Sequence, residues 1–70
     1  MCAITPREYE VLKLIANELT MVEIAKQLYL SMETVKSHRK NLLKKLQAKN
    51  TAGLIRRAFE QHLLTIHQAA

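Results

Sequence analysis

The chain has 70 residues, of which 49% are hydrophobic, with one glycine, one proline and one cysteine. This length allows one domain with a small core, and the composition favours helices over strands. The lone Cys2 excludes an intrachain disulfide framework, and no apolar run approaches the roughly 20 residues of a membrane span. We therefore expect one all-α domain over residues 1–70, located in the cytoplasm and with no membrane partner.

The net charge of +5 lies almost wholly in the second half of the chain. Residues 34–57 contain eight basic residues and no acidic residue, whereas residues 1–33 contain three basic and five acidic residues. Such an asymmetry indicates a phosphate-rich partner; the alternative is a solvated charged face.

The first helix is predicted over residues 6–17. Thr5-Pro6-Arg7-Glu8 has the pattern of a capping box, in which the Thr5 hydroxyl accepts a backbone N–H and the Glu8 side chain reaches back. Pro6 suits the first helical position. Apolar residues then recur at helical spacing and give this segment a core face: Val11, Leu12, Ile15, Ala16 and Leu19.

Three further helices are predicted over residues 21–28, 32–46 and 51–62. Thr20 with Glu23 repeats the capping signature, and Ser31 and Thr51 offer caps to the last two helices. In the helix over 32–46 the basic side chains lie opposite an apolar stripe formed by Val35, Leu42 and Leu46. The helix over 51–62 has its own apolar residues, Leu54, Ile55, Ala58 and Phe59.

The helices over 21–28 and 32–46 are joined by a short turn, and the second of them is basic. These are the requirements of a helix-turn-helix that lays its second helix in the major groove. Four residues are predicted to set the angle between the two helices. Ala25 allows a close crossing, Leu30 fills the turn, Val35 packs back from the second helix, and His38 is a half-buried spacer.

Several motifs span nearly the whole chain: Thr5-Pro6-Arg7-Glu8 with Val11-Leu12, Glu23-Ile24-Ala25, Leu28, Leu30-Ser31, Thr34-Val35-Lys36-Ser37-His38 and Lys45-Leu46. Through them residues 4–64 resemble the LuxR-type (LuxR/FixJ) DNA-binding domain of bacterial transcription regulators. The resemblance implies a four-helix output domain whose helix over 32–46 enters the major groove of double-stranded DNA. It also implies a homodimer through the helix over 51–62, with RNA polymerase as a candidate partner. This dimer is expected to be weak, because so short a chain has little apolar area beyond its own core. Residues 65–70, which follow the match, are expected to be a frayed tail.

Four residues are candidates for reading bases: Lys36, Ser37, Lys40 and Asn41. The two lysines lie one turn apart in the N-terminal half of their helix, and lysine donates to guanine O6 and N7. Asn41 matches adenine, although a surface asparagine is the commoner explanation. Ser37 either contacts a base edge or leaves room for the groove wall.

Six residues are predicted to contact phosphates: Thr20, Thr34, Arg39, Lys44, Lys45 and Thr51. Arg39 falls within the apolar stripe, so its guanidinium is expected to extend to a phosphate or to an acidic residue of the helix over 6–17. Lys44 and Lys45 have the alternative of being simply solvated. Three apolar residues that are spread too widely to be all core are predicted to form the dimer face: Leu54, Ala58 and Leu63.

No enzymatic, metal or cofactor site is predicted. Cys2, His38, His62 and His67 lack the spacing of a zinc site. The sequence also lacks a Ser/His/acid set, a glycine-rich phosphate loop and paired carboxylates.

The chain departs from the family at three helix ends, where the family commonly has glycine and this chain has Glu18, Gln47 and His62. A non-glycine residue costs about 1 kcal/mol in the left-handed conformation. We therefore expect these helices to end a residue earlier or later, with Asn17 and Asn50 making the turn.

Two alternatives stay open. The fourth region of sigma factors has a similar start and helix-turn-helix, although Thr34-Val35-Lys36-Ser37-His38 fits the LuxR type better. A helical protein-interaction module would instead use the helix over 51–62 to bind a partner helix.

Overall fold

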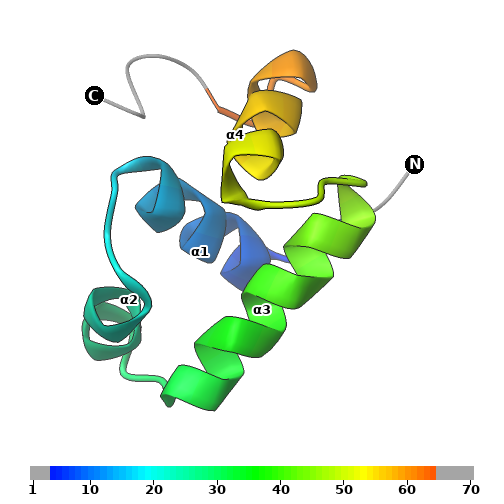
Figure 1. Cartoon of the computed structure of the whole chain (residues 1–70). Helices are drawn as coiled ribbons and strands as arrows, with labels where there is room; N and C mark the ends of the chain where they lie inside the picture. Colours follow the sequence, from blue (N-terminus) through cyan, green and yellow to red (C-terminus); the bar gives the residue numbers. More distant parts are fainter. Residues whose placement is uncertain (1–3, 65–70) are drawn as a thin grey trace.

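The computed structural model describes residues 4–64, which form four helices and, within that range, no strand. They are α1 (Pro6–Ala16), α2 (Met21–Leu28), α3 (Met32–Lys45) and α4 (Thr51–Glu60) (Figure 1). The all-α prediction is confirmed, and α2 has the predicted bounds. The other three helices start where expected, but α1 and α3 end one residue early and α4 ends two residues early. The predicted tail at 65–70 lies outside the described residues.

The starts of the first three helices are capped as their sequences predict. The Thr5 hydroxyl accepts the Glu8 N–H at 3.1 Å while the Glu8 carboxylate accepts the Thr5 N–H at 3.0 Å, and Thr20 with Glu23 forms the same box. Ser31 Oγ accepts the N–H of Thr34 at 3.1 Å. All three caps close within four residues, so each depends only on local sequence.

The prediction that Thr51 caps α4 was wrong by one residue. The cap is Asn50, whose Oδ1 accepts the Gly53 N–H at 2.8 Å, and Thr51 is the first helical residue. Asparagine is at least as good a cap as threonine, and its position sets Thr51 free for a contact with α3.

Each helix is followed, within two residues of its end, by a left-handed residue and then by a hydrophobic one. The left-handed residues are Glu18, Tyr29, Gln47 and His62, with φ between 56° and 67°. The next residue always donates its N–H to the carbonyl five positions earlier, for example Leu30 to Ala25 at 2.9 Å and Ala48 to Leu43 at 2.8 Å. This is the Schellman arrangement, and all four following residues pack against the core: Leu19, Leu30, Ala48 and Leu63.

The turn residues predicted from the missing glycines were therefore wrong. Asn17 has φ −90° and Asn50 has φ −154°, so neither is left-handed. The chain keeps the turn at Glu18, Gln47 and His62 because the hydrophobic residue that follows must reach the core. Each of these residues bears a backbone cost of about 1 kcal/mol that glycine would avoid.

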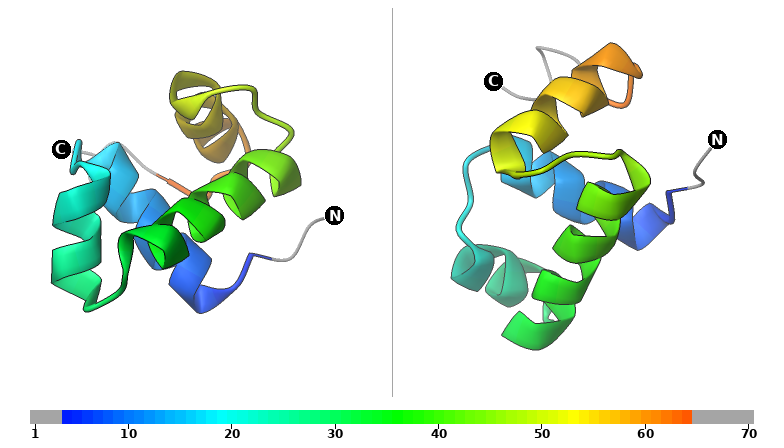
Figure 2. Two further views of the ribbon diagram at one scale, coloured as in Figure 1. Left: turned by 60° about the horizontal axis from the view of Figure 1, so that its bottom comes forward. Right: turned by 45° about the vertical axis from the view of Figure 1, so that its right-hand side comes forward.

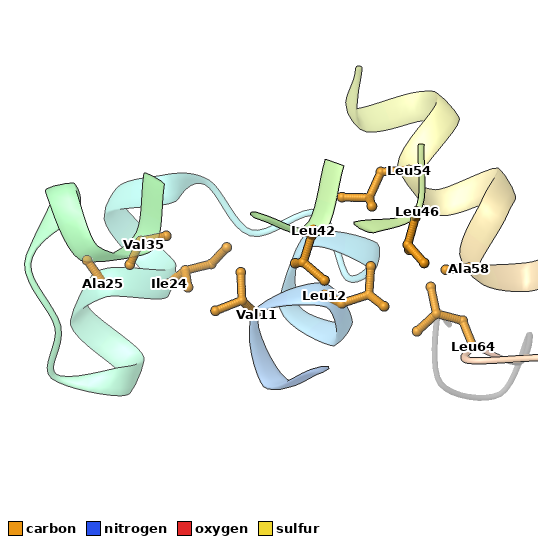
Figure 3. Close-up of a cluster of buried hydrophobic side chains, with 10 residues drawn as sticks. All are labelled: Val11, Leu12, Ile24, Ala25, Val35, Leu42, Leu46, Leu54, Ala58 and Leu64. Carbon is orange, nitrogen blue, oxygen red and sulfur yellow. The ribbon is translucent and has the colours of Figure 1, made fainter. Parts of the chain in front are cut away.

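The helices enclose one core, with α3 packed against each of the other three. α2 lies beside the N-terminal half of α3 and α4 lies near its C-terminal end, as the further views show (Figure 2). The buried side chains form a continuous row through the domain (Figure 3): Val11, Leu12, Ile24, Ala25, Val35, Leu42, Leu46, Leu54, Ala58 and Leu64. This packing fixes which side of α3 faces outward.

Candidate nucleic-acid interface

α2 and α3 form a helix-turn-helix in which small and branched side chains meet at the crossing. Ala25 is 7% exposed and Val35 is fully buried, and both lie near Ile24 (Figure 3). Leu30 in the turn and His38 on α3 are half-buried. The two helices are therefore held at a fixed angle by buried contacts, which leaves the opposite side of α3 to solvent.

The outer side of α3 is a polar and basic surface. Five side chains on it are exposed: Lys36, Ser37, Lys40, Asn41 and Lys44. One acidic residue, Glu33, lies beside them, and its carboxylate is 4.0 Å from the Lys36 ammonium with both side chains mostly in water. An ion pair this exposed contributes little and leaves the lysine available. All four predicted base-reading residues are thus on one surface.

Thr34 is half-buried near the start of α3, where its hydroxyl lies 2.9 Å from the Ser31 hydroxyl. Its backbone N–H is already taken by the Ser31 cap. Each hydroxyl carries one proton and can accept as well, so one of the two can donate to an outside acceptor while the pair stays intact.

Arg39 contacts α4 and no acidic residue of α1. Its Nη2 donates to Thr51 Oγ1 at 2.7 Å and its Nε donates to the same oxygen at 3.3 Å. The expectation of an acidic partner on α1 was therefore wrong. Arg39 lies on the side of α3 that faces the start of α4, and a half-buried guanidinium takes the nearest acceptor there.

A cavity of about 590 Å³ opens beside this contact. Its lining comes from the end of α1, the start of α2, the middle of α3 and the start of α4: Ile15, Leu19, Thr20, Met21, Lys36, Arg39 and Thr51. Three of the six predicted phosphate contacts, Thr20, Arg39 and Thr51, are brought together here. Thr34, Lys44 and Lys45 do not line this cavity.

Lys45 binds within the fold. Its ammonium lies 2.6 Å from the Glu8 carboxylate, whose side chain is 5% exposed, and so joins the end of α3 to the start of α1. Burial alone would raise the pKa of Glu8, but the hydrogen bonds from Lys45 and from the Thr5 N–H outweigh it and hold this pKa below its ordinary value. The structure thus gives Lys45 a partner inside the fold, where its charge neutralises a buried carboxylate, and its contact with phosphate stays a prediction.

Two of the three residues predicted for the dimer face belong to the core. Leu54 and Ala58 are fully buried against the other helices, and Leu63 is half-buried. The prediction was wrong for Leu54 and Ala58 because a 70-residue chain needs the whole apolar stripe of α4 to close its core.

The outer side of α4 carries charges that the sequence interpretation did not assign. A second cavity of about 470 Å³ lies between this side and the α3–α4 connection, and three basic residues line it: Lys49, Arg56 and Arg57. Arg56 also pairs with Glu60 at 3.2 Å. The signal was present in the sequence, since Arg56 falls opposite Leu54 and Ala58 on a helical wheel and Arg57 lies beside their stripe.

Within residues 4–64 there is no cluster of His, Cys, Asp and Glu that could hold a metal ion. Cys2 and His67 lie outside the described residues. None of the four described helices has the length and apolar character needed to cross a bilayer.

Comparisons with known proteins place this geometry in a family. The model of the family described as bacterial regulatory proteins, luxR family, matches residues 3–58. The transcriptional regulatory protein MctR of Rhizobium johnstonii is 44% identical over 62 residues, which cover 89% of this chain and 29% of MctR. The uncharacterized response regulatory protein YgeK of Escherichia coli is 44% identical over 63 residues, which cover 90% of this chain and 43% of YgeK.

A solved structure has the same fold. The response regulator ChrA of a heme-sensing two-component system superposes with a TM-score of 0.86 at 31% identity, over 91% of this chain and 32% of ChrA. The chain thus spans less than half the length of the relatives it matches. With four helices, a helix-turn-helix and a family match over most of its residues, the chain belongs to the luxR family of bacterial regulatory proteins.

Proposed function

We propose that this chain, as one domain, binds double-stranded DNA sequence-specifically as the output domain of a bacterial transcription regulator, with α3 in the major groove. The observation that carries the proposal is the exposed basic side of α3, which is held outward by a buried row of apolar residues on the opposite side. Family membership and the names of the relatives support the regulatory role. We propose RNA polymerase as a further partner.

Within this proposal the polar residues of α3 divide into readers and positioning contacts. Lys36 and Lys40 are exposed in the N-terminal and middle turns and donate to guanine, while Ser37 and Asn41 lie between and beside them. Lys44 is exposed one turn further along and contacts phosphate without reading sequence.

We also propose a weak homodimer through α4, which would place two copies on two-fold-related half-sites. Because Leu54 and Ala58 are core residues, the contact must use the exposed stripe of Ala52, Arg56 and Glu60 together with the half-buried Leu63. Arg56 and Glu60 can pair across a two-fold axis as they do within one helix.

The test of the function is a titration of the ¹⁵N-labelled chain with duplex DNA. Amide shifts should cluster between Ser31 and Lys45, and affinity for random duplexes should fall steeply with salt. Shifts centred on Tyr9 to Ala16 would contradict the docking of α3, and an absence of salt-dependent binding would indicate a protein-interaction module.

The same assay separates reading from positioning. At a preferred site, Lys40→Ala should cost about 1–3 kcal/mol and relax the preference at one base pair. Lys44→Ala is the matched control, and should weaken binding to all sequences by a similar factor. The roles are reversed if Lys44→Ala changes the preferred base.

A further inference from the structure

We propose that the cavity lined by Thr20, Lys36, Arg39 and Thr51 receives one backbone phosphate of duplex DNA, and that Arg39, oriented by Thr51, binds it. This inference rests on the proposed function. The sequence indicated Thr20, Arg39 and Thr51 as three separate phosphate contacts, whereas the structure brings them to one place and gives them different tasks.

The electrostatics of the cavity favour an anion. Two basic side chains, Lys36 and Arg39, line it, and none of its lining residues is acidic. The starts of two helices also meet there, α2 at Met21 and α4 at Thr51, and each helix start carries partial positive charge. Apolar side chains complete the lining, so the attraction is less screened than on an open surface.

Arg39 is oriented before any ligand arrives. Its two hydrogen bonds to Thr51 Oγ1 use two of the five donors of a guanidinium, which leaves the rest for phosphate oxygens. Because Thr51 accepts both bonds, its role is to position Arg39, and the link joins the start of α4 to the middle of α3. A planar donor group held in one orientation suits the tetrahedral oxygens of a phosphate.

The Thr20 hydroxyl is similarly prepared. It accepts the Glu23 N–H at 3.2 Å, so its own proton remains for an outside acceptor at the start of α2.

The occupant is a DNA phosphate because of where the cavity lies. Lys36 belongs both to the cavity lining and to the exposed side of α3 that we place in the major groove. A strand that borders the groove must pass beside that helix, and a backbone phosphate fixes the register of the protein on the duplex without reading bases.

The test compares three variants and one control variant on random duplex DNA over a range of salt concentrations. Arg39→Gln should weaken binding to all sequences roughly tenfold and lower the slope of log K against log salt by about 0.9. Thr51→Val should weaken binding several-fold with an unchanged slope, because it removes no charge. In the double variant, Thr51→Val should add nothing to Arg39→Gln. Arg7→Gln, at the start of α1 and outside the cavity, is the matched arginine control and should have a smaller effect.

Folding and anion controls complete the experiment. Thermal melting checks that each variant folds. If Arg39→Gln does not fold, Arg39→Lys takes its place, and it should keep the slope but lose affinity because lysine lacks the planar, forked donors of a guanidinium. Inorganic phosphate, titrated at constant ionic strength, should give no saturable shift of the Arg39 Nε–H resonance. Saturation would identify a small-anion site instead and overturn the assignment.

The outcomes separate this site from the function. If the unmodified chain binds duplex DNA with a steep slope and Arg39→Gln leaves both affinity and slope unchanged, the phosphate site is wrong and DNA binding stands. If the unmodified chain shows no salt-dependent binding to duplex DNA, both proposals are wrong.

Discussion

Lys45 shows how far a single residue can depart from what its type and position indicate. It follows Lys44 in a basic block, and a helical wheel places it at the border between the polar side and the apolar stripe of α3. The structure pairs it with Glu8, which also closes the capping box of α1. A carboxylate that satisfies both a helix start and an ammonium from another helix couples the two elements through one side chain.

We expect Lys45→Met to lower the free energy of unfolding by about 1–3 kcal/mol at neutral pH, because it leaves the buried Glu8 carboxylate without its charged partner. Lys44→Met is the matched control, since Lys44 is exposed and should change stability by less than about 0.5 kcal/mol. Urea denaturation measures both. Equal midpoints for the two variants would mean that the pair contributes nothing.

The same pair sets a pH dependence. The pKa of Glu8 in the folded state lies below its ordinary value. Glu8 therefore adds stability above that value, and this stability is lost as the pH falls through the lower, folded pKa. In Lys45→Met, the folded-state pKa of Glu8 should rise, because burial then acts without the opposing ammonium. The free energy of unfolding should therefore fall less on acidification in the variant than in the unmodified chain. Denaturation of the two proteins from pH 7 to pH 3 checks the sign.

At the scale of the helices, starts were predictable and ends were not. Three starts followed from pairs or single residues within one turn, such as Thr5 with Glu8 and Thr20 with Glu23. The ends depend on a left-handed residue, for which glycine is the usual signal, and none of the four left-handed residues is glycine. The usable signal was the hydrophobic residue that follows, such as Leu19 or Ala48, because it must turn back to the core.

Replacing a left-handed residue after a helix by glycine should stabilise the fold. Gln47→Gly should raise the free energy of unfolding by about 0.5–1 kcal/mol, because glycine adopts the left-handed φ of 56° without steric cost. Gln61→Gly is the same substitution at φ −94°, where glycine adds only chain entropy, so it should lower stability by about 0.5–1 kcal/mol. Thermal unfolding that moves both variants in the same direction would show that the left-handed backbone is not what costs stability.

For the whole molecule, the fold class, the number of helices and the exposed side of α3 were predictable because each follows from a period along the chain. The contacts of Arg39 and Lys45 were not, since both join residues far apart in sequence. The same reason explains the error on α4. From the sequence of this helix alone, the stripe of Leu54 and Ala58 fits a core and a dimer face equally well, and only the packing of the other helices shows that it is core.

The charge on α4 bears on assembly of the whole domain. The core uses its buried apolar stripe, and the outer side carries Arg56 and Arg57, which like charges on a second copy would oppose. We expect the chain to be largely monomeric at low micromolar concentration without DNA, as sedimentation velocity would measure. A tight dimer under these conditions would contradict the weak association proposed for α4.

The contact between Lys45 and Glu8 joins residues 37 apart, whereas the caps of α1, α2 and α3 close over three. We expect these caps to form early in folding, because closing a loop of three residues costs little chain entropy. The long contact needs α1 and α3 already packed, so it belongs on the native side of the folding barrier. We therefore expect the ammonium of Lys45 to slow the unfolding of the domain more than it speeds its folding.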